Sequence, residues 1–445
     1  MGYVSNTDID RKEMLAAIGT GSFSELLPIP EDVRLHELLD VPKSLDENSL
    51  YRYLSKLSAR NISMDDYPCF LGAGIYDHFR PAVIGALASR GEFCTAYTPY
   101  QPEMSQGMLQ AIYEFQTFVC ALTGMDLSNA SMYDAATGLA EAALMSVSIT
   151  GRSTVVVLKN VHPHYRQVNQ TYLNTTEDNY IEIDAENLND VDSSTVACVI
   201  CQNPDFFGRV EDLAAISEYT HRIGAMLVVS VDPVSLALLK PPSDYDADIV
   251  VGEGQSLGNA PAFGGPLLGF FACKKKYVRS FPGRIVGATQ DLQGRRGYTM
   301  TLRTREQDIR REKATSNICT NQSLLALCTT IHLSALGKHG LRQVAAASLL
   351  NAHNTADALC KIPGVSMKFP DQRYFKEFVL KLPISPEKTS KLLVELGVIG
   401  GLPLGKYYTD MSDCMLFCVT ETRSEEDIQL LVDSMRTIVD KEARI

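Results

Sequence analysis

The sequence predicts an α/β protein with a large, mostly parallel sheet and a small α+β domain after it. From about Cys69 to Lys275, helical segments alternate with short apolar runs rich in β-branched residues, as in a parallel sheet covered by helices. Beyond a long helical region the chain follows a β-α-β-α order. We therefore expect an N-terminal helical arm (1–68), a large α/β domain (69–335), and a long helix with the small C-terminal domain (336–445).

In the arm, "NTDIDRKEMLAAIG" predicts a helix that Thr7 or Asp8 caps and Gly19 closes. "FSELLPIPEDV" predicts a second helical piece that ends in prolines. We expect this arm to pack on another part of the protein or on a partner.

The central elements follow from apolar runs and helical periodicity. We expect strands at 153–161, 194–204, 225–233, 247–254 and 268–275, and helices at 139–149 and 212–224. In the C-terminal part we expect a long helix at 322–362, strands at 375–383 and 413–421, and helices at 385–398 and 424–443.

Composition limits the function classes. With 445 residues, of which 45% are hydrophobic and 21% charged, the chain has enough apolar residues for a large core. A net charge of −12 argues against nucleic acid or an anionic membrane as the main partner. The N-terminal "MGYVSNTDIDRKEML" resembles no export signal, and no apolar run reaches the roughly 20 residues of a membrane span, so we expect a soluble, cytoplasmic protein.

The cysteines favour no metal or redox site. There are eleven, scattered and mostly in apolar runs, where cysteine behaves as a small core residue. Cys198 and Cys201 form a C-x-x-C pair, but residues three apart on a strand point to opposite faces. We expect no metal site.

Polar residues follow several predicted strands, at the edge of the sheet where open α/β proteins bind ligands. Thr137 and Gly138 lie at a helix N-terminus, where backbone amides can hold a phosphate. The other candidates are His162, His164, Asn203 and Asp232. Taken singly, each is more often a cap, turn or loop residue than a catalytic one, so the prediction depends on their order.

That order is typical of pyridoxal phosphate (PLP) enzymes of the aspartate aminotransferase type. Such a site needs a residue that stacks on the ring, an Asp that keeps the pyridine nitrogen protonated, and a Lys that forms a Schiff base. His162 and Asp232 suit the first two roles. In "ADIVVGEGQSLG", however, Ser256 stands where the lysine would be, and serine cannot form a Schiff base.

Several longer segments resemble one family over nearly the whole chain. "FLGAGIYDHFRP", "AYTPYQPEMSQGMLQAIYEFQT", "QNPDFFGRVED", "FGGPLLGFFA" and "TREQDIRREKATSNICTNQSLLAL" are similar to the glycine dehydrogenase (decarboxylating) family, the P-protein of the glycine cleavage system. The resemblance is strongest to subunit 1, the N-terminal-half subunit of the two-chain form.

The resemblance implies a PLP-dependent transferase fold of type I, an enzyme subunit that is inactive alone, and a PLP-bearing partner, subunit 2, in an α2β2 heterotetramer. It also implies decarboxylation of glycine and transfer of the aminomethyl group to the lipoyl group of the H-protein. The alternatives are a structural or regulatory scaffold for subunit 2 and a self-sufficient PLP enzyme that uses a displaced lysine.

Two segments are candidates for reaching the partner's pocket. Residues 95–107 contain Tyr97 and Tyr100, whose hydroxyls could bind the glycine carboxylate or line a lipoyl channel, or whose rings could simply pack at the interface. Residues 303–322 contain Asn317 and Cys319, which resemble family positions near the cleft.

The segment 303–313 is basic in an otherwise acidic chain. It could bind subunit 2 or the H-protein, or form a solvated helix face with pairs such as Glu306 to Arg310. Its basic residues are Arg303, Arg305, Arg310, Arg311 and Lys313.

Overall fold

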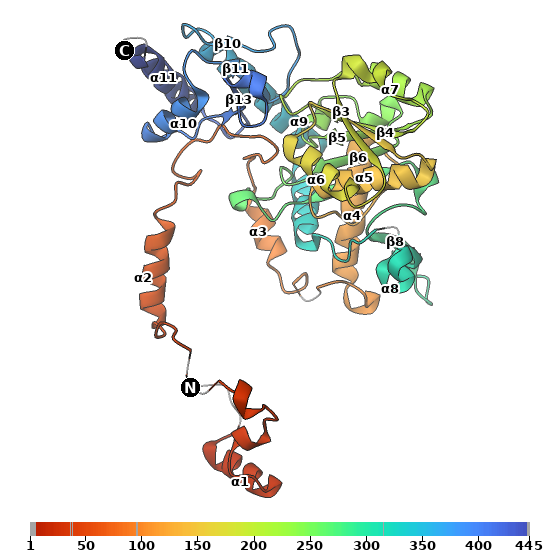
Figure 1. Cartoon of the computed structure of the whole chain (residues 1–445), viewed down its shortest axis with the longest axis vertical. Coiled ribbons are helices and arrows are strands. Elements are labelled where there is room, and N and C mark those ends of the chain that lie inside the picture. The colour runs from red at the N-terminus through yellow and green to blue at the C-terminus, as the bar shows by residue number, and fades with distance from the viewer. Residues whose placement is uncertain (1–5, 36, 38, 95–96, 315, 443–445) are drawn as a thin grey trace. The chain divides into compact units, whose positions relative to one another are not determined.

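The structure is a computed structural model that describes residues 6–35, 37, 39–94, 97–314 and 316–442 (Figure 1). It divides into two units, residues 1–62 and 63–445.

Among its described residues, the first unit contains the α-helices α1 (Asp8–Ile18) and α2 (Glu47–Ser58). Thr7 caps α1 and Gly19 closes it in the left-handed conformation, which confirms both predicted ends. The second predicted helical piece, over 23–33, is not one continuous helix. That stretch forms two short 3₁₀ turns, Phe23–Leu26 and Glu31–Val33, because Pro28 and Pro30 lack the N–H groups that a continuous helix needs.

The second unit is built on a seven-stranded sheet in the order β1-β7-β6-β5-β4-β2-β3. The pairs from β6 through β5, β4 and β2 to β3 are parallel, and β7 runs antiparallel to both β6 and β1. The predicted mostly parallel sheet is therefore confirmed. Its strands are β1 (Leu127–Ser128), β2 (Thr154–Leu158), β3 (Asn179–Ile183), β4 (Val196–Asn203), β5 (Met226–Val231), β6 (Ile249–Glu253) and β7 (Gly269–Cys273).

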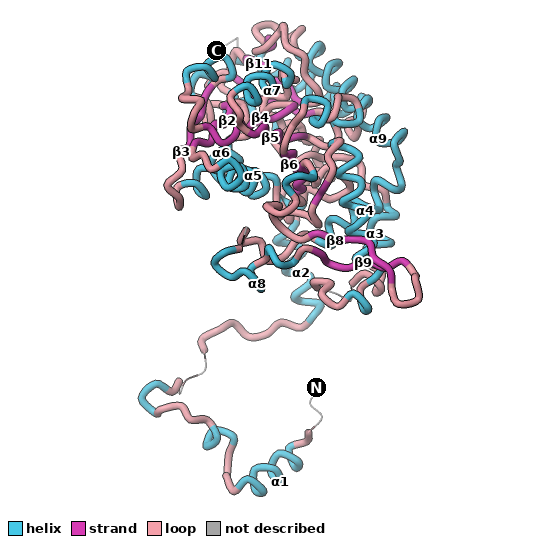
Figure 2. The backbone as a smooth tube through the Cα atoms, turned by 90° about the vertical axis from the view of Figure 1, so that its right-hand side faces the viewer, coloured by secondary structure: helices cyan, strands magenta, loops and turns pink. Residues whose placement is uncertain are grey.

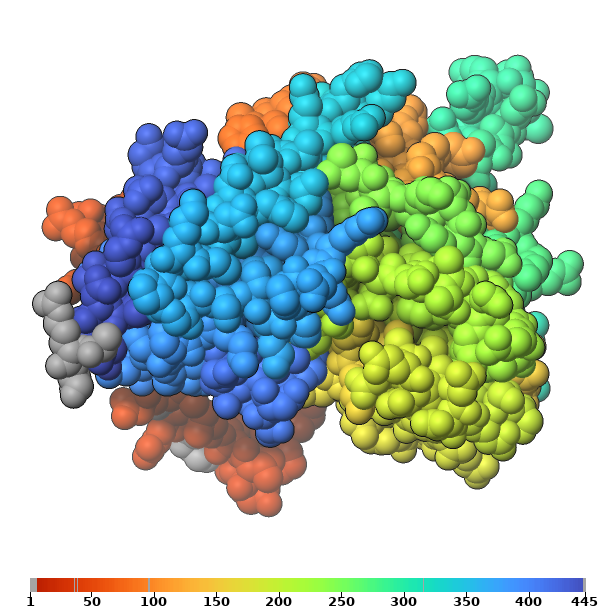
Figure 3. All heavy atoms as spheres, turned by 90° about the horizontal axis from the view of Figure 1, so that it is seen from above, coloured from red at the N-terminus to blue at the C-terminus, as the bar shows by residue number. Residues whose placement is uncertain are grey.

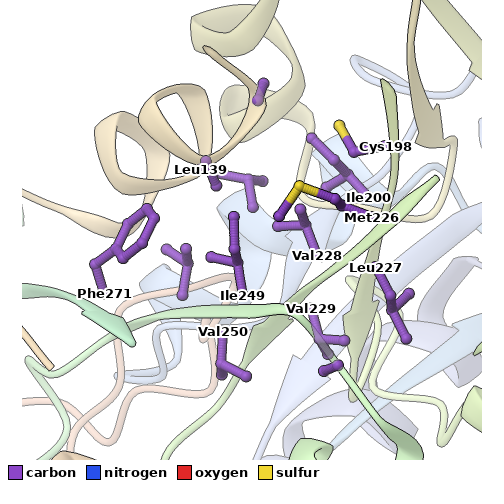
Figure 4. Close-up of a cluster of buried hydrophobic side chains, with 14 of the residues drawn as sticks. Leu139, Cys198, Ile200, Met226, Leu227, Val228, Val229, Ile249, Val250 and Phe271 are labelled. Carbon is purple, nitrogen blue, oxygen red and sulfur yellow. The ribbon is translucent and has the colours of Figure 1, made fainter. Parts of the chain in front are cut away.

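Helices cover this sheet and complete its core. Leu139 of α5 points toward strand side chains that include Val228, Ile249 and Phe271, all of them inaccessible to solvent (Figure 4). This packing explains why the five predicted strands consist of apolar runs. The helices of the large domain are α3 (Ala82–Ala88), α4 (Gln106–Thr123), α5 (Ala135–Thr150), α6 (Pro163–Leu173) and α7 (Leu213–Arg222).

A β-hairpin leaves the large domain after β7 (Figure 2). Its strands β8 (Ile285–Gln290) and β9 (Arg296–Thr301) pair antiparallel. The basic segment follows as short turns and the single-turn helix α8 (Gln307–Arg310).

The C-terminal part begins with the long helix α9 (Ser323–Leu359), whose backbone departs from helical geometry at Gly337. It continues as a four-stranded antiparallel sheet with two helices. The predicted β-α-β-α series corresponds to β11, α10, β13 and α11, and the two-residue strands β10 and β12 were not predicted. Figure 3 shows this region, in blue, packed directly beside the yellow-green α/β domain. Its elements are β10 (Ser366–Met367), β11 (Glu377–Lys381), α10 (Pro386–Glu395), β12 (Leu402–Pro403), β13 (Cys414–Cys418) and α11 (Glu425–Glu442).

The described part of the chain has neither a membrane-spanning helix nor a cluster of metal ligands. None of its helices has the length and apolar character needed to cross a membrane. No group of three or more His, Cys, Asp or Glu side chains is placed there to hold a metal ion.

Candidate active site

Two of the predicted cofactor residues line one small cavity at the carboxyl edge of the sheet. His162 follows β2 and Asp232 follows β5, as expected for an open α/β sheet. The cavity has a volume of about 30 Å³, which is room for one or two water molecules. Neither Ser256 nor Thr137 belongs to its lining.

A lysine from the C-terminal part of the chain, Lys376, lines the same cavity. The side chain of Lys376 is 1% exposed, and its Nζ lies 2.8 Å from Oδ2 of Asp232. The same ammonium lies 2.9 Å from Nε2 of His78 and 3.5 Å from the ring centre of Tyr76. No sequence pattern predicts the burial of Lys376, because it lies directly before β11, far along the chain from Asp232 and His78.

His162 is held in one orientation by its own hydrogen bonds. Its ring Nε2 donates to the carbonyl of Ala73, and Nδ1 accepts from the N–H of His164. Its ring stacks on Tyr165, with ring centres 4.4 Å apart. Burial lowers the pKa of His162 to about 4, so the ring is neutral at physiological pH.

The N-terminus of α5, where the sequence predicted a phosphate site, is already capped by carboxylates. The N–H of Thr137 donates to Asp134, and the N–H of Ala135 donates to Glu253. Glu253 also accepts from the N–H groups of Gln255 and Leu268. Burial raises its pKa to about 7, against the opposing effect of these donors. Gly138, one position further on, packs against the strands rather than facing an open site.

Ser256 belongs to the loop that follows β6. It is buried, and its Oγ has no hydrogen-bond partner among the described residues. The neighbouring Gln255 joins this loop to the segment at Tyr76, accepting from its N–H and donating to its carbonyl.

These residues do not fit pyridoxal phosphate. Position 256 offers no amine, Lys376 occupies the neighbourhood of Asp232, and two carboxylates take the amides that a phosphate would need. A phosphate dianion beside Asp134 and Glu253 would be repelled rather than bound.

A second cluster brings together residues from the two segments predicted to reach a partner. Nη2 of Arg284 donates to the hydroxyl of Tyr100 at 2.6 Å and to the carbonyl of Cys319. The guanidinium groups of Arg284 and Arg303 lie 4.7 and 5.0 Å from the ring centre of Tyr100. We name Tyr100, Arg284, Arg303 and Cys319 the tyrosine–arginine cluster.

Arg284 is buried, whereas Tyr100 and Cys319 are exposed. The N–H of Cys319 donates to the hydroxyl of Tyr133, which ties the segment to the start of α5. No sequence pattern marks Arg284 as a site residue, because its partners lie far from it along the chain. Tyr97 and Asn317, the other two predicted residues, are exposed, and no contact places either of them in this cluster.

The basic segment divides into buried and exposed parts. Arg305 is buried and donates to the carbonyls of Phe281 and Gly283, so its predicted role as a surface charge is wrong. The predicted pair of Glu306 with Arg310 is also absent, because the Glu306 carboxylate lies 3.8 Å from Arg284. Arg303 pairs with Asp308. The exposed basic residues are Arg310, Arg311 and Lys313.

Glu141 of α5 makes stability depend on pH. Burial raises its pKa from 4.5 to about 7, opposed by a hydrogen bond from Ser316. Because the folded state holds this proton more tightly than the unfolded chain, the favourable contribution is complete below pH 4.5 and is lost as pH rises through 7. We expect Glu141→Gln to raise the free energy of unfolding at pH 8 by up to about 3 kcal/mol, with little gain at pH 4.5.

Urea unfolding at both pH values measures this effect. Glu218→Gln, at an exposed position on α7, is the matched control and should change neither value. Equal effects of Glu141→Gln at both pH values would contradict the assignment.

The fold and this site together define a class of protein. The chain has the fold of PLP-dependent enzymes of fold type I. It superimposes on a cysteine desulfurase from Escherichia coli with a TM-score of 0.61 over 84% of this chain and 97% of that one, at 13% identity, a likeness that concerns the fold alone. A sphingosine-1-phosphate lyase from Burkholderia pseudomallei gives a TM-score of 0.62 at 15% identity, covering 93% and 96% of the two chains.

Residues 1–435 match the profile of the glycine cleavage system P-protein, and the chain belongs to that family. It is 50% identical to a probable glycine dehydrogenase (decarboxylating) subunit 1 of Desulfitobacterium hafniense, with 98% of this chain and 100% of the relative covered. A relative of the same description from Thermomicrobium roseum is 48% identical, over 98% and 99% of the two chains. The crystal structure of an inhibitor-bound glycine decarboxylase (P-protein) has a TM-score of 0.90 at 43% identity, covering 98% of this chain and 100% of that one.

Proposed function

We propose that this chain is the subunit of a glycine dehydrogenase (decarboxylating) that does not carry PLP. The observation that supports this most is the buried ion pair of Lys376 with Asp232. It agrees with the sequence prediction that Ser256 stands where a Schiff-base lysine would be. Its relatives are described as subunit 1, a description that calls for a second subunit. The partner, subunit 2, then carries the cofactor in an α2β2 heterotetramer.

In this arrangement PLP on the partner supplies the electron sink for decarboxylation of glycine. The aminomethyl group passes to the lipoyl group of the H-protein. This chain contributes the tyrosine–arginine cluster to the rim of the partner's pocket. The exposed Tyr100 hydroxyl, held by the buried Arg284, is chemically suited to contact a carboxylate. Tyr97 and Asn317 are further candidates for contacts with that pocket.

The exposed basic residues provide a positively charged surface for binding a partner. Arg310, Arg311 and Lys313 lie next to this cluster in sequence and are exposed. Since the chain as a whole carries a net charge of −12, this local positive charge is suited to an acidic partner surface on subunit 2 or the H-protein.

We expect the chain purified alone to catalyse no glycine–bicarbonate exchange, because it offers no amine at position 256. Borohydride reduction in the presence of PLP should leave no pyridoxyl label on a specific lysine. Adding a PLP-bearing subunit 2 should give a stable complex and restore exchange. Exchange by the isolated chain, or stoichiometric labelling of one of its lysines, would overturn the proposal.

A further inference from the structure

Lys376 is a buried cation whose donors all find partners inside the protein. An ammonium group has three N–H donors and no acceptor. One faces Asp232 at 2.8 Å, one faces Nε2 of His78 at 2.9 Å, and the group also lies 3.5 Å from the centre of the Tyr76 ring. Burying a charge is favourable only when it is compensated in this way.

The residues around this cation are fixed in turn. His78 presents Nε2 as an acceptor because its Nδ1 donates to Glu421 at 2.6 Å. Burial and the charge of Lys376 lower the pKa of His78, in keeping with a neutral ring. The Tyr76 hydroxyl donates to Glu377, the residue after Lys376. The cation therefore sits in a site built by both domains.

Asp232, the ion-pair partner of Lys376, shows which role this lysine takes over. In PLP enzymes of this fold, an Asp at the end of a strand faces the protonated nitrogen of the pyridine ring. Asp232 follows β5 at the carboxyl edge of the sheet, and here it faces the nitrogen of a lysine. Both nitrogens present a positively charged N–H to the carboxylate, so the lysine satisfies the aspartate without a cofactor.

We propose that Lys376 takes the place of a cofactor's pyridine nitrogen as the cation that neutralises Asp232, and that its side chain thereby excludes pyridoxal compounds from this chain's own site. On this proposal, two differences separate this site from a cofactor site. The first is the absence of a Schiff-base lysine. The second is Lys376, a lysine from the small domain that takes the space of the ring and links the two domains.

This inference goes beyond the proposed function, because it concerns a pocket that the partner's chemistry does not use. It can be tested on the isolated chain, without subunit 2 or the H-protein. A failure to exchange glycine in the complex would count against the proposed function and leave this inference standing.

The first test is chemical rescue. Lys376→Ala leaves Asp232 buried without its cation, and we expect the melting temperature to fall by roughly 5 °C. Propylammonium replaces the deleted atoms, so at millimolar concentration it should restore at least half of the loss. The neutral analogue 1-propanol should restore none of it.

The double variant Lys376→Ala/Asp232→Asn is the matched control. It contains the same deletion but no carboxylate, so propylammonium should not raise its melting temperature. Absence of rescue in Lys376→Ala, or equal rescue in the double variant, would overturn the role of Lys376 as the counter-cation of Asp232.

The second test addresses exclusion directly and uses pyridoxal, which lacks the phosphate that Asp134 and Glu253 would repel. Ser256→Lys alone should show no Schiff-base absorbance with pyridoxal, since Lys376 still fills the site. Ser256→Lys/Lys376→Ala should gain that absorbance and carry a borohydride-stable label at position 256. Labelling of the single variant, or no labelling of the double variant, would overturn exclusion by Lys376.

Discussion

Replacing Arg284 by alanine is expected to lower the glycine–bicarbonate exchange rate of the assembled enzyme about 100-fold, with the heterotetramer still formed. The side chain holds both the Tyr100 hydroxyl and the Cys319 carbonyl, which come from two separate segments. Without it, each segment loses the bond that fixes it to the other. A displacement of about 1 Å at a reacting site costs on the order of 100-fold in rate.

The measurements are the exchange rate at saturating H-protein and the mass of the purified complex. Arg295→Ala is the matched control, because this arginine lies in the turn of the nearby β8–β9 hairpin and its side chain is 77% exposed. It should leave the exchange rate near wild type. Tyr100→Phe keeps the ring next to both guanidinium groups but removes the hydroxyl, so it separates the hydrogen bond from the packing.

The same experiment separates an active-site contribution from a purely structural role. If the chain is only a scaffold for subunit 2, variants that assemble normally should turn over normally. An Arg284→Ala complex with full assembly and an unchanged exchange rate would therefore favour the scaffold and contradict a role of the tyrosine–arginine cluster in the pocket.

The sheet was predictable because its central strands are buried on both sides. β2, β4, β5, β6 and β7 consist mainly of apolar residues, and such runs are visible without tertiary information. β3 lies at the edge of the sheet with half-exposed, polar positions, so its sequence "NYIEI" gave no comparable signal. The β8–β9 hairpin was missed for the same reason, since most of its residues are exposed or half-buried.

Site residues that directly follow a strand could be predicted from the sequence. Contacts that form only when the two domains pack together could not. His162 and Asp232 follow predicted strands, so their meeting at one cavity follows from the topology. Lys376 reaches Asp232 only because the small domain packs on the large one. Arg305 looks like its basic neighbours in sequence, and only its contacts with two backbone carbonyls show that it is buried.

Gly208→Ala is expected to disrupt that domain packing, with a loss of more than about 4 kcal/mol in the free energy of unfolding. Gly208 follows β4 and has a φ of +83°, in the left-handed region that favours glycine. A Cβ placed there would lie 2.0 Å from the carbonyl oxygen of Glu377, which belongs to β11. Because the obstacle is backbone, no side-chain rotation can relieve the clash.

Gly151→Ala is the matched control that separates the two costs. Gly151 closes α5 with a φ of +65°, but a Cβ there meets nothing within 4 Å. Gly151→Ala should therefore lower the free energy of unfolding by only about 1–2 kcal/mol, the penalty for alanine in a left-handed backbone conformation. Thermal and urea unfolding of the two variants give the difference, which measures the contact between Gly208 and Glu377.

The position of the clash makes the outcome specific. The N–H of Phe375 donates to the carbonyl of Gly208 at 3.0 Å, so Phe375 and Glu377, the two neighbours of Lys376, both meet this loop. Pushing that strand away should also pull Lys376 from Asp232. We therefore expect hydrogen exchange in folded Gly208→Ala to rise first at residues 375–377. A loss no larger than that of Gly151→Ala would show that the domains tolerate separation at this point.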